Sequence, residues 1–264
     1  MLKLGLMGYG AIGKDVIHAM AAGELPGLAC PAVLVRRARQ EPEAPPLVAD
    51  AEAFFAHPYD VVLEVAGHQA IRNHGARVLE QGADLLVTSV GAFTDPALFD
   101  RIMDAARANG RRVIVPSAGV GALDYLSAAA QGGLDEVVMT VRKDAASWKG
   151  THAETLCDLD RLTEPKVIYD GPARGGAAAY PQNVNISAAV SLAGLGLDRT
   201  RLILYADPER GPHIVQVEAR GRFGRFLFRS EGVPSTENRK TGIIVAMAVI
   251  KTLRQLTSTL VVGG

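Results

Sequence analysis

A glycine-rich turn near the start of the chain constrains its fold more than any other feature. Residues 3–7 are a short, mostly apolar run, and Gly8, Gly10 and Gly13 follow with the spacing G-x-G-x-x-G. An apolar-periodic segment at residues 11–22 comes next, so the turn is expected to join a strand to a helix. The first glycine permits a tight turn, the second lets the backbone approach a pyrophosphate, and the third allows close helix–strand packing. We therefore expect a dinucleotide-binding turn. The alternative is a glycine turn in the same kind of fold that binds nothing.

The first half of the chain alternates apolar strands with helices. Further strands are expected at residues 32–35, 60–65, 84–89 and 112–115, and helices at residues 69–81 and 95–109. Nearly continuous apolar strands are typical of a parallel sheet that is covered on both faces. Their alternation with helices indicates repeated βαβ units. The sequence thus predicts an α/β fold with a Rossmann-type doubly wound parallel sheet, forming a dinucleotide-binding domain over residues 1–118.

The pattern changes in the second half. Strands are expected at residues 136–142, 166–169, 201–205, 214–220 and 224–230, and helices at residues 123–130, 185–195 and 240–257. Several of these strands alternate apolar and polar residues, which favours an antiparallel sheet with one wet face. We predict an α+β catalytic domain with a mixed or antiparallel sheet at residues 119–236, serving substrate binding and dimerisation. Residues 237–264 are predicted to be a C-terminal helix that packs back on the first domain.

Composition excludes several classes of function. Lys+Arg and Asp+Glu both number 28, so no basic excess favours nucleic acid or an anionic membrane surface. No apolar run reaches the ~18 residues of a membrane span, and the N-terminal segment does not resemble a secretory signal. Cys30 and Cys157 do not make a disulfide framework, and His152 and Cys157 are too isolated to bind a metal. We expect a cytoplasmic protein without a metal site.

Two arginines follow the second expected strand. An NAD site usually places Asp or Glu there, to bond the ribose 2′-hydroxyl. Here Arg36 and Arg37 take that place, and a guanidinium can pair with the 2′-phosphate of NADP. This favours NADP, or use of both NAD and NADP. The alternative is a pair of solvated arginines on a loop.

Two more loops are expected at the carboxyl ends of strands, where ligands of open α/β sheets bind. One contains Ala66, Gly67 and His68, and the other contains Ser89 and Gly91. Small residues there would keep a crevice open for a flat nicotinamide ring. His68 either lines this crevice or only caps the helix that follows.

Several longer segments follow one another along the chain. They are residues 8–13 (Gly-Tyr-Gly-Ala-Ile-Gly), 64–68 (Glu-Val-Ala-Gly-His), 89–92 (Ser-Val-Gly-Ala), 119–124 (Gly-Val-Gly-Ala-Leu-Asp), 180–185 (Tyr-Pro-Gln-Asn-Val-Asn), 191–198 (Ser-Leu-Ala-Gly-Leu-Gly-Leu-Asp), 206–208 (Ala-Asp-Pro) and 238–241 (Asn-Arg-Lys-Thr). In this order they resemble the L-aspartate dehydrogenase family over nearly the whole chain. The resemblance implies oxidation of L-aspartate to iminosuccinate with NAD or NADP, followed by hydrolysis to oxaloacetate and ammonia. It also implies a homodimer and, in some bacteria, a supply of iminosuccinate for NAD biosynthesis.

The resemblance also carries over individual residues. Gly119 and Asn185 correspond to cofactor contacts of the family, and His213 to its catalytic histidine. A histidine titrates near neutral pH and so suits a base that takes a proton from the amine. The family has Asn two residues before this histidine, whereas this chain has Gly211-Pro212. Proline fixes its own φ, so the loop that aims His213 is expected to differ. The alternative is that His213 is only a polar loop residue before a strand.

A dicarboxylate substrate needs cationic or N–H partners for both carboxylates. Lys240 and Thr241 are expected to open the last helix, and Asn183 or Asn185 could bond the nicotinamide carboxamide or simply cap a helix. Weaker candidates are Arg142 and Lys143 at the end of a strand and Arg174 in a glycine-rich turn. The predicted cofactor contacts are Gly8, Gly10, Ala11, Ile12, Gly13, Arg36, Arg37, Ala66, Gly67, His68, Ser89, Gly91, Gly119 and Asn185; the predicted substrate contacts are Asn183, Lys240 and Thr241.

Two other functions stay open at this point. The chain could be a related NAD(P)-dependent imine or amino-acid reductase with another substrate, which the changed loop before His213 suggests. It could also be a catalytically weak protein that binds a dinucleotide and acts as a sensor.

Overall fold

The structure is a computed structural model of the 264-residue chain, and it describes residues 1–42, 44–181, 185–209, 211–233 and 242–263. The chain divides into two compact units. Unit 1 comprises Met1–Pro116 together with Ala246–Gly264, and unit 2 comprises Ser117–Val245. Within the described ranges, no helix is long and apolar enough to cross a membrane.

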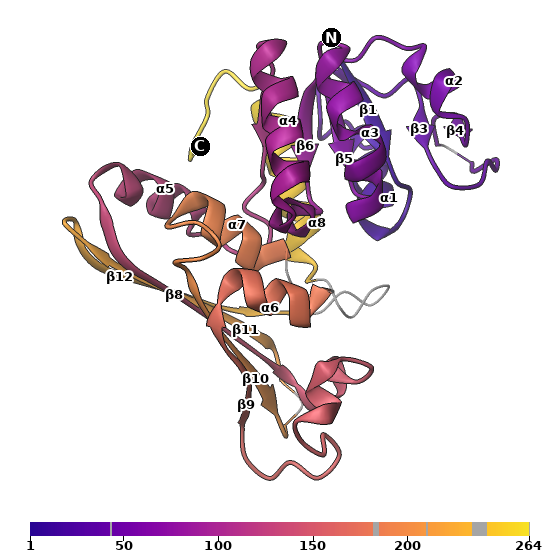
Figure 1. Cartoon of the computed structure of the whole chain (residues 1–264). Coiled ribbons are helices and arrows are strands. Elements are labelled where there is room, and N and C mark those ends of the chain that lie inside the picture. The colour runs from indigo at the N-terminus through magenta and orange to yellow at the C-terminus, as the bar shows by residue number, and fades with distance from the viewer. Residues whose placement is uncertain (43, 182–184, 210, 234–241, 264) are drawn as a thin grey trace. The chain divides into compact units, whose positions relative to one another are not determined.

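Unit 1 is built on a parallel sheet (Figure 1). Its strands are β1 (Leu2–Met7), β2 (Leu28–Ala29), β3 (Val33–Leu34), β4 (Leu47–Val48), β5 (Val61–Glu64), β6 (Asp84–Val87) and β7 (Val113–Ile114). They run in the order β4-β3-β1-β5-β6-β7, with β2 also paired to β1, and every strand pair is parallel. This confirms the predicted Rossmann-type sheet.

The helices of unit 1 begin where the sequence provides caps. They are α1 (Ala11–Ala21), α2 (Ala51–Phe55), α3 (His68–Glu80), the 3-10 helix η1 (Val90–Thr94) and α4 (Pro96–Ala108). Asp50 caps α2 by accepting two backbone N–H bonds, and Asp95 caps α4, which has proline at its first position. An added Cβ at Gly75 of α3 would lie 2.7 Å from Ile102 of α4, so glycine lets these two helices pack closely.

The last helix, α8 (Ile244–Gln255), contributes to the core of unit 1. Its Val249 and Leu253 are fully buried in the same cluster as Leu4 and Leu6 of β1 and Val16 of α1. Burial of an aliphatic side chain of this size stabilises a fold by about 1.5–3 kcal/mol. The C-terminal segment is therefore part of unit 1.

Unit 2 contains a mixed five-stranded sheet. Its strands are β8 (Leu134–Asp144), β9 (Lys166–Pro172), β10 (Arg201–Asp207), β11 (His213–Gly221) and β12 (Gly224–Gly232). Their order is β12-β11-β8-β10-β9; β8 and β10 are parallel and the other pairs antiparallel. The predicted α+β unit with a mixed sheet is confirmed.

Helices cover one face of this sheet (Figure 1). They are α5 (Leu123–Gln131), α6 (Ala173–Ala179) and α7 (Asn185–Ala193), and the 3-10 helices η2 (Ala145–Trp148) and η3 (His152–Thr155) follow β8. An added Cβ at Gly176 of α6 would lie 2.6 Å from Leu202 of β10, and one at Gly194 would lie 3.4 Å from Val137 of β8. The side chains of Leu202 and Val137 thus define the helix-covered face.

One expectation about this unit is wrong. Arg174 was expected in a glycine-rich turn, but it lies in α6. The glycines of this segment serve close packing, because an added Cβ at Gly175 would lie 2.4 Å from the hydroxyl of Tyr169. The Arg174 side chain pairs with Asp198 at 2.6 Å.

Candidate functional site

The glycine turn lies at the point where the order of the parallel sheet reverses. β1 has β3 on one side and β5 on the other, and ligands of open α/β sheets bind at the carboxyl end of such a strand. Gly8 has a φ of 104°, and its N–H donates to the carbonyl of Leu34 at 2.9 Å. An added Cβ at Gly8 would lie 2.9 Å from the backbone of Val65, and one at Gly13 would lie 2.4 Å from the Gly8 carbonyl oxygen. Both positions therefore require glycine.

Gly10 has a different reason to be glycine. An added Cβ there would meet nothing within 4 Å, so no packing within the protein explains the residue. Gly10 is the N-cap of α1, no side chain caps this helix end, and its first turn carries no acidic residue. The space and the N–H groups of the first turn, which contains Ala11 and Ile12, fit a phosphate group.

The loop after β3 carries exposed cations beside the glycine turn. Arg36 and Arg37 lie in a bend and are exposed, and residues 35–40 contain no Asp or Glu. The guanidinium of Arg39 lies 5.8 Å from the ring centroid of Tyr9, and it also pairs with Glu41 at 2.7 Å. The sequence alone did not indicate Arg39, since only this ring contact places it beside the turn.

Glu64, the last residue of β5, ties two loops together. It is fully buried, and its carboxylate accepts the N–H groups of Ala66 and Gly67, both at 2.7 Å. It also accepts the N–H of Ser89 at 3.1 Å and the Ser89 hydroxyl at 2.9 Å. Burial raises the pKa of the Glu64 carboxyl, while these hydrogen bonds act in the opposite direction. The two predicted crevice loops are thus joined through one carboxylate.

Glu64 was not among the residues expected in the site. The available signal was an acidic residue at the end of a buried parallel strand, directly before a small-residue loop. His68 is the first residue of α3 and is half-buried, and Gly91 is buried in η1. The structure therefore brings the glycine turn and both small-residue loops to the carboxyl edge of one sheet.

In unit 2, Gly119 and Asn185, which the resemblance assigns to cofactor contacts, lie in segments that are close together. Asn185 is the exposed first residue of α7, and an added Cβ at Gly119 would lie 3.6 Å from the neighbouring Ile186 side chain. Ala118, directly before Gly119, has a φ of 46°, which is costly for a residue with a side chain. Strained backbone of this kind concentrates at binding sites.

His213 is the first residue of β11 and lies opposite Gly232 of β12. Its side chain is only 9% exposed. His213, Val215, Val217 and Ala219 alternate with less buried residues, so they share the helix-covered face of the sheet. The strand expected at residues 214–220 therefore begins one residue earlier, at His213, directly after Pro212.

The predicted substrate contacts Asn183, Lys240 and Thr241 lie outside the described residues. Among the described residues, the final helix begins at Ile244. Arg142 makes a bidentate pair with Asp207, with distances of 2.9 and 3.0 Å. The guanidinium of Arg142 is therefore already paired with a carboxylate of the protein itself.

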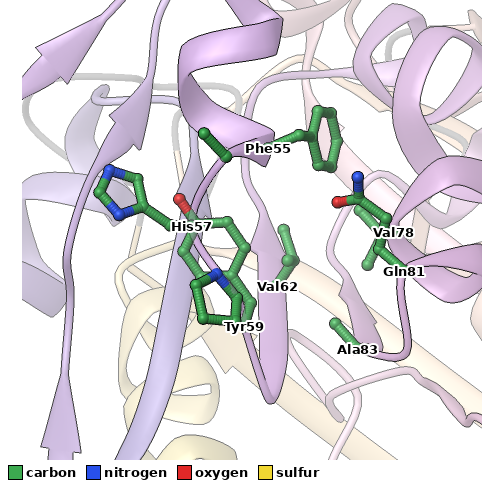
Figure 2. Close-up of a pocket in the computed structure, with 9 residues that line it drawn as sticks. Phe55, His57, Tyr59, Val62, Val78, Gln81 and Ala83 are labelled. Carbon is green, nitrogen blue, oxygen red and sulfur yellow. The ribbon is translucent and has the colours of Figure 1, made fainter.

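A hollow of about 280 Å³ in unit 1 lies away from this site. Figure 2 shows its lining, which includes His57, Tyr59, Val62 and Ala83. These residues lie at the amino ends of β5 and β6, whereas the glycine turn follows the carboxyl end of β1. Among the described residues, no group of three or more His, Cys, Asp or Glu side chains is placed to hold a metal.

Comparisons with known proteins agree with this arrangement. Residues 124–256 match the family model described as aspartate dehydrogenase, C-terminal, and residues 8–116 match the NAD-binding domain of homoserine dehydrogenase. The L-aspartate dehydrogenase of Pseudomonas aeruginosa is 42% identical over 261 residues, covering 96% of this chain and 97% of that protein. The chain belongs to the L-aspartate dehydrogenase family. The enzyme of the same name from Cupriavidus necator is 40% identical over 259 residues, again covering 96% of this chain and 97% of that protein.

Solved structures agree on the fold. Aspartate dehydrogenase from Thermotoga maritima matches with a TM-score of 0.80 and 21% identity, covering 100% of both chains. A hyperthermophilic archaeal homoserine dehydrogenase in complex with NADPH matches with a TM-score of 0.64 and 10% identity, covering 97% of both chains. The chain therefore shares with these dehydrogenases a fold in which a Rossmann-type parallel sheet is followed by a mixed sheet.

Proposed function

We propose that the chain is an NAD(P)-dependent L-aspartate dehydrogenase. It oxidises L-aspartate to iminosuccinate, which hydrolyses to oxaloacetate and ammonia, and the reverse reaction is a reductive amination. The observation that carries this proposal is the 42% identity to the Pseudomonas aeruginosa enzyme over 96% of the chain. A match of this extent includes both unit 1, which contains the glycine turn, and unit 2, which contains His213.

The residues of unit 1 fit a dinucleotide. The turn at Gly8 and Gly13 admits no side chain, and the space at Gly10 accepts a pyrophosphate against the start of α1. Arg36 and Arg37, which are exposed in the loop after β3, would pair with a 2′-phosphate, and this supports NADP or use of both cofactors. In unit 1, the crevice-loop residues Ala66, Gly67, His68, Ser89 and Gly91 would lie along the nicotinamide half of the cofactor. In unit 2, the resemblance supports a role in cofactor binding for Gly119 and Asn185.

His213 is the proposed base of the reaction. A bound nicotinamide supplies the hydride acceptor, and the substrate amine must lose a proton as its carbon is oxidised. A buried imidazole held at the start of a strand accepts that proton without competition from bulk water. In the reverse reaction the same imidazole returns the proton to the nitrogen.

Substrate binding and assembly extend the proposal. Asn183, Lys240 and Thr241 belong to segments that resemble the family, and their side chains suit the two carboxylates of aspartate. We further propose that the protein is a homodimer, which the resemblance implies, and that it is cytoplasmic, which its lack of a disulfide framework favours. Analytical ultracentrifugation tests the dimer directly.

A substrate panel tests the proposed activity. The purified chain is mixed with L-aspartate and other L-amino acids, each with NAD and with NADP, and nicotinamide absorbance is followed. We expect turnover with L-aspartate above that with every other amino acid. If only a different amino acid were oxidised, that amino acid would be the substrate in place of L-aspartate. Tight cofactor binding without any turnover would favour the interpretation that the chain is a dinucleotide-binding sensor.

A further inference from the structure

Lys143 is a buried cation at the end of β8. It is only 7% exposed, and it is the only buried lysine or arginine among the residues that the structure describes. Removing an ammonium group from water is costly, so a buried lysine at the end of a strand points to a role for its charge. Its ammonium group lies over the ring of the fully buried Trp148, 5.6 Å from the ring centroid.

The sheet register places this cation beside the proposed base. Val215 of β11 pairs with Val141 of β8, and Ile214 pairs with Arg142. Continuing the antiparallel ladder by one residue sets His213 opposite Lys143. Side chains at directly opposite positions have Cβ atoms about 4.5–5.5 Å apart on the same face of a sheet.

The alternation of burial agrees with this register. Val137, Met139, Val141 and Lys143 are the buried positions of β8, and they share the helix-covered face with His213. Arg142 points to the other face and pairs with Asp207. Lys143 rather than Arg142 is therefore the cation that shares a face with the imidazole.

We propose that Lys143 binds a carboxylate of the substrate next to His213. This inference rests on the proposed function, since it assumes that the ligand at His213 is a dicarboxylate. The amine that His213 deprotonates is attached to the carbon that bears one carboxylate, and the second carboxylate lies two bonds further on. An ammonium group one strand away from the imidazole is within reach of such an anion.

Succinate, a dicarboxylate that lacks the reacting amine, is the probe. Its affinity for the full chain with NAD present is measured by titration calorimetry for the wild type, Lys143→Met and Lys143→Gln. We expect both substitutions to weaken succinate binding by about 10- to 100-fold, the range for loss of a charged hydrogen bond. Lys149→Met is the matched control, because Lys149 is an exposed lysine that pairs with Asp160, and it should bind succinate as the wild type does.

Kinetics separate this role from a structural one. Lys143 contacts a group that does not react, so its loss should raise the KM for L-aspartate about 10- to 100-fold with little change in kcat. A His213→Asn variant should show the opposite split, with reduced kcat and unchanged succinate affinity. Circular dichroism checks that each variant is folded, and if Lys143→Met is unfolded, Lys143→Gln decides.

The outcomes distinguish the two proposals. Unchanged succinate affinity in the folded Lys143 variants, or no binding of succinate to the wild type, would overturn the role of Lys143. Absence of L-aspartate turnover by the wild type, combined with succinate binding that depends on Lys143, would overturn the proposed activity and keep the carboxylate site.

Discussion

The carboxylate of Glu64 accepts both the backbone N–H and the hydroxyl of Ser89, at 3.1 and 2.9 Å. Glu64 ends β5, and Ser89 lies two residues beyond the end of the neighbouring parallel strand β6, so one buried side chain sets the spacing of two loops at the carboxyl edge of the sheet. The same edge holds the glycine turn. The geometry of the proposed nicotinamide crevice therefore depends on a residue that does not need to touch the cofactor.

Replacing Glu64 tests this dependence. Glu64→Gln introduces an amide that cannot accept all four hydrogen bonds, so we expect the free energy of unfolding to fall by about 2 kcal/mol and cofactor affinity to fall with it. Urea denaturation and a fluorescence titration with NADH measure the two effects. Glu52→Gln is the control, because Glu52 is an exposed partner of Arg77 and should change neither quantity appreciably. Equal stability of the Glu64 variant and the wild type would contradict the proposed coupling.

The glycine turn gives a prediction that separates binding from folding. Gly10→Ala places a methyl group in open space, so it should leave stability unchanged but weaken cofactor binding about tenfold or more by obstructing the pyrophosphate. Gly13→Ala should destabilise the protein itself, since its Cβ would meet the Gly8 carbonyl oxygen at 2.4 Å.

Gly132→Ala, at the exposed end of α5, is the control for a glycine substitution. It should leave cofactor affinity unchanged. If Gly10→Ala bound the cofactor as tightly as the wild type does, the proposed binding of the pyrophosphate at this turn would be contradicted.

Ala118 is expected to be a site of stored strain. Its φ of 46° costs about 1–2 kcal/mol for a residue with a Cβ, whereas glycine adopts it freely. Ala118→Gly should stabilise the protein by about 0.5–1 kcal/mol after the greater freedom of glycine in the unfolded chain is subtracted. The thermal midpoint measures this, and a lower midpoint than that of the wild type would rule out strain at this residue.

His74 makes stability depend on pH. Burial and then the nearby Arg77 guanidinium lower the pKa of His74 below its ordinary value, and its ring lies 5.8 Å from that of Phe55. Between the unfolded and the lower folded pKa, the unfolded chain binds a proton that the folded chain does not. Stability should therefore fall as pH drops below about 6.5.

A His74→Phe variant lacks the imidazole that binds this proton, so it should lose less stability than the wild type as the pH falls below about 6.5. Urea denaturation at several pH values compares it with the wild type. Identical slopes for both proteins would show that another group causes the pH dependence.

The locally encoded parts of the fold could be predicted from the sequence. The segment from β1 through the glycine turn to α1 is one strand, one turn and one periodic helix, and each has its own signal. The two-residue strands β2 and β4 and the five-residue helix α2 are too short to show a period. Helix α6 was missed because its two glycines indicate a turn, although here they accommodate Tyr169 and Leu202.

Parts of the site depend on pairing between distant segments. The resemblance identified His213, but the position of Lys143 beside it follows from the register of β8 and β11, which single-strand patterns do not encode. Likewise, the strand pairing that joins Glu64 to Ser89 spans 25 residues of sequence. Local patterns located the elements, whereas the partners of their side chains required the assembled sheets.

The central claim is that this chain oxidises L-aspartate with His213 as the base. The most direct measurement is kcat for L-aspartate oxidation by the wild type and by His213→Ala, each measured once with saturating NAD and once with saturating NADP. The account predicts measurable turnover by the wild type and a kcat lower by about 10²- to 10⁴-fold in the variant, with cofactor affinity retained. No turnover of L-aspartate by the wild type, or a variant as fast as the wild type, would contradict it.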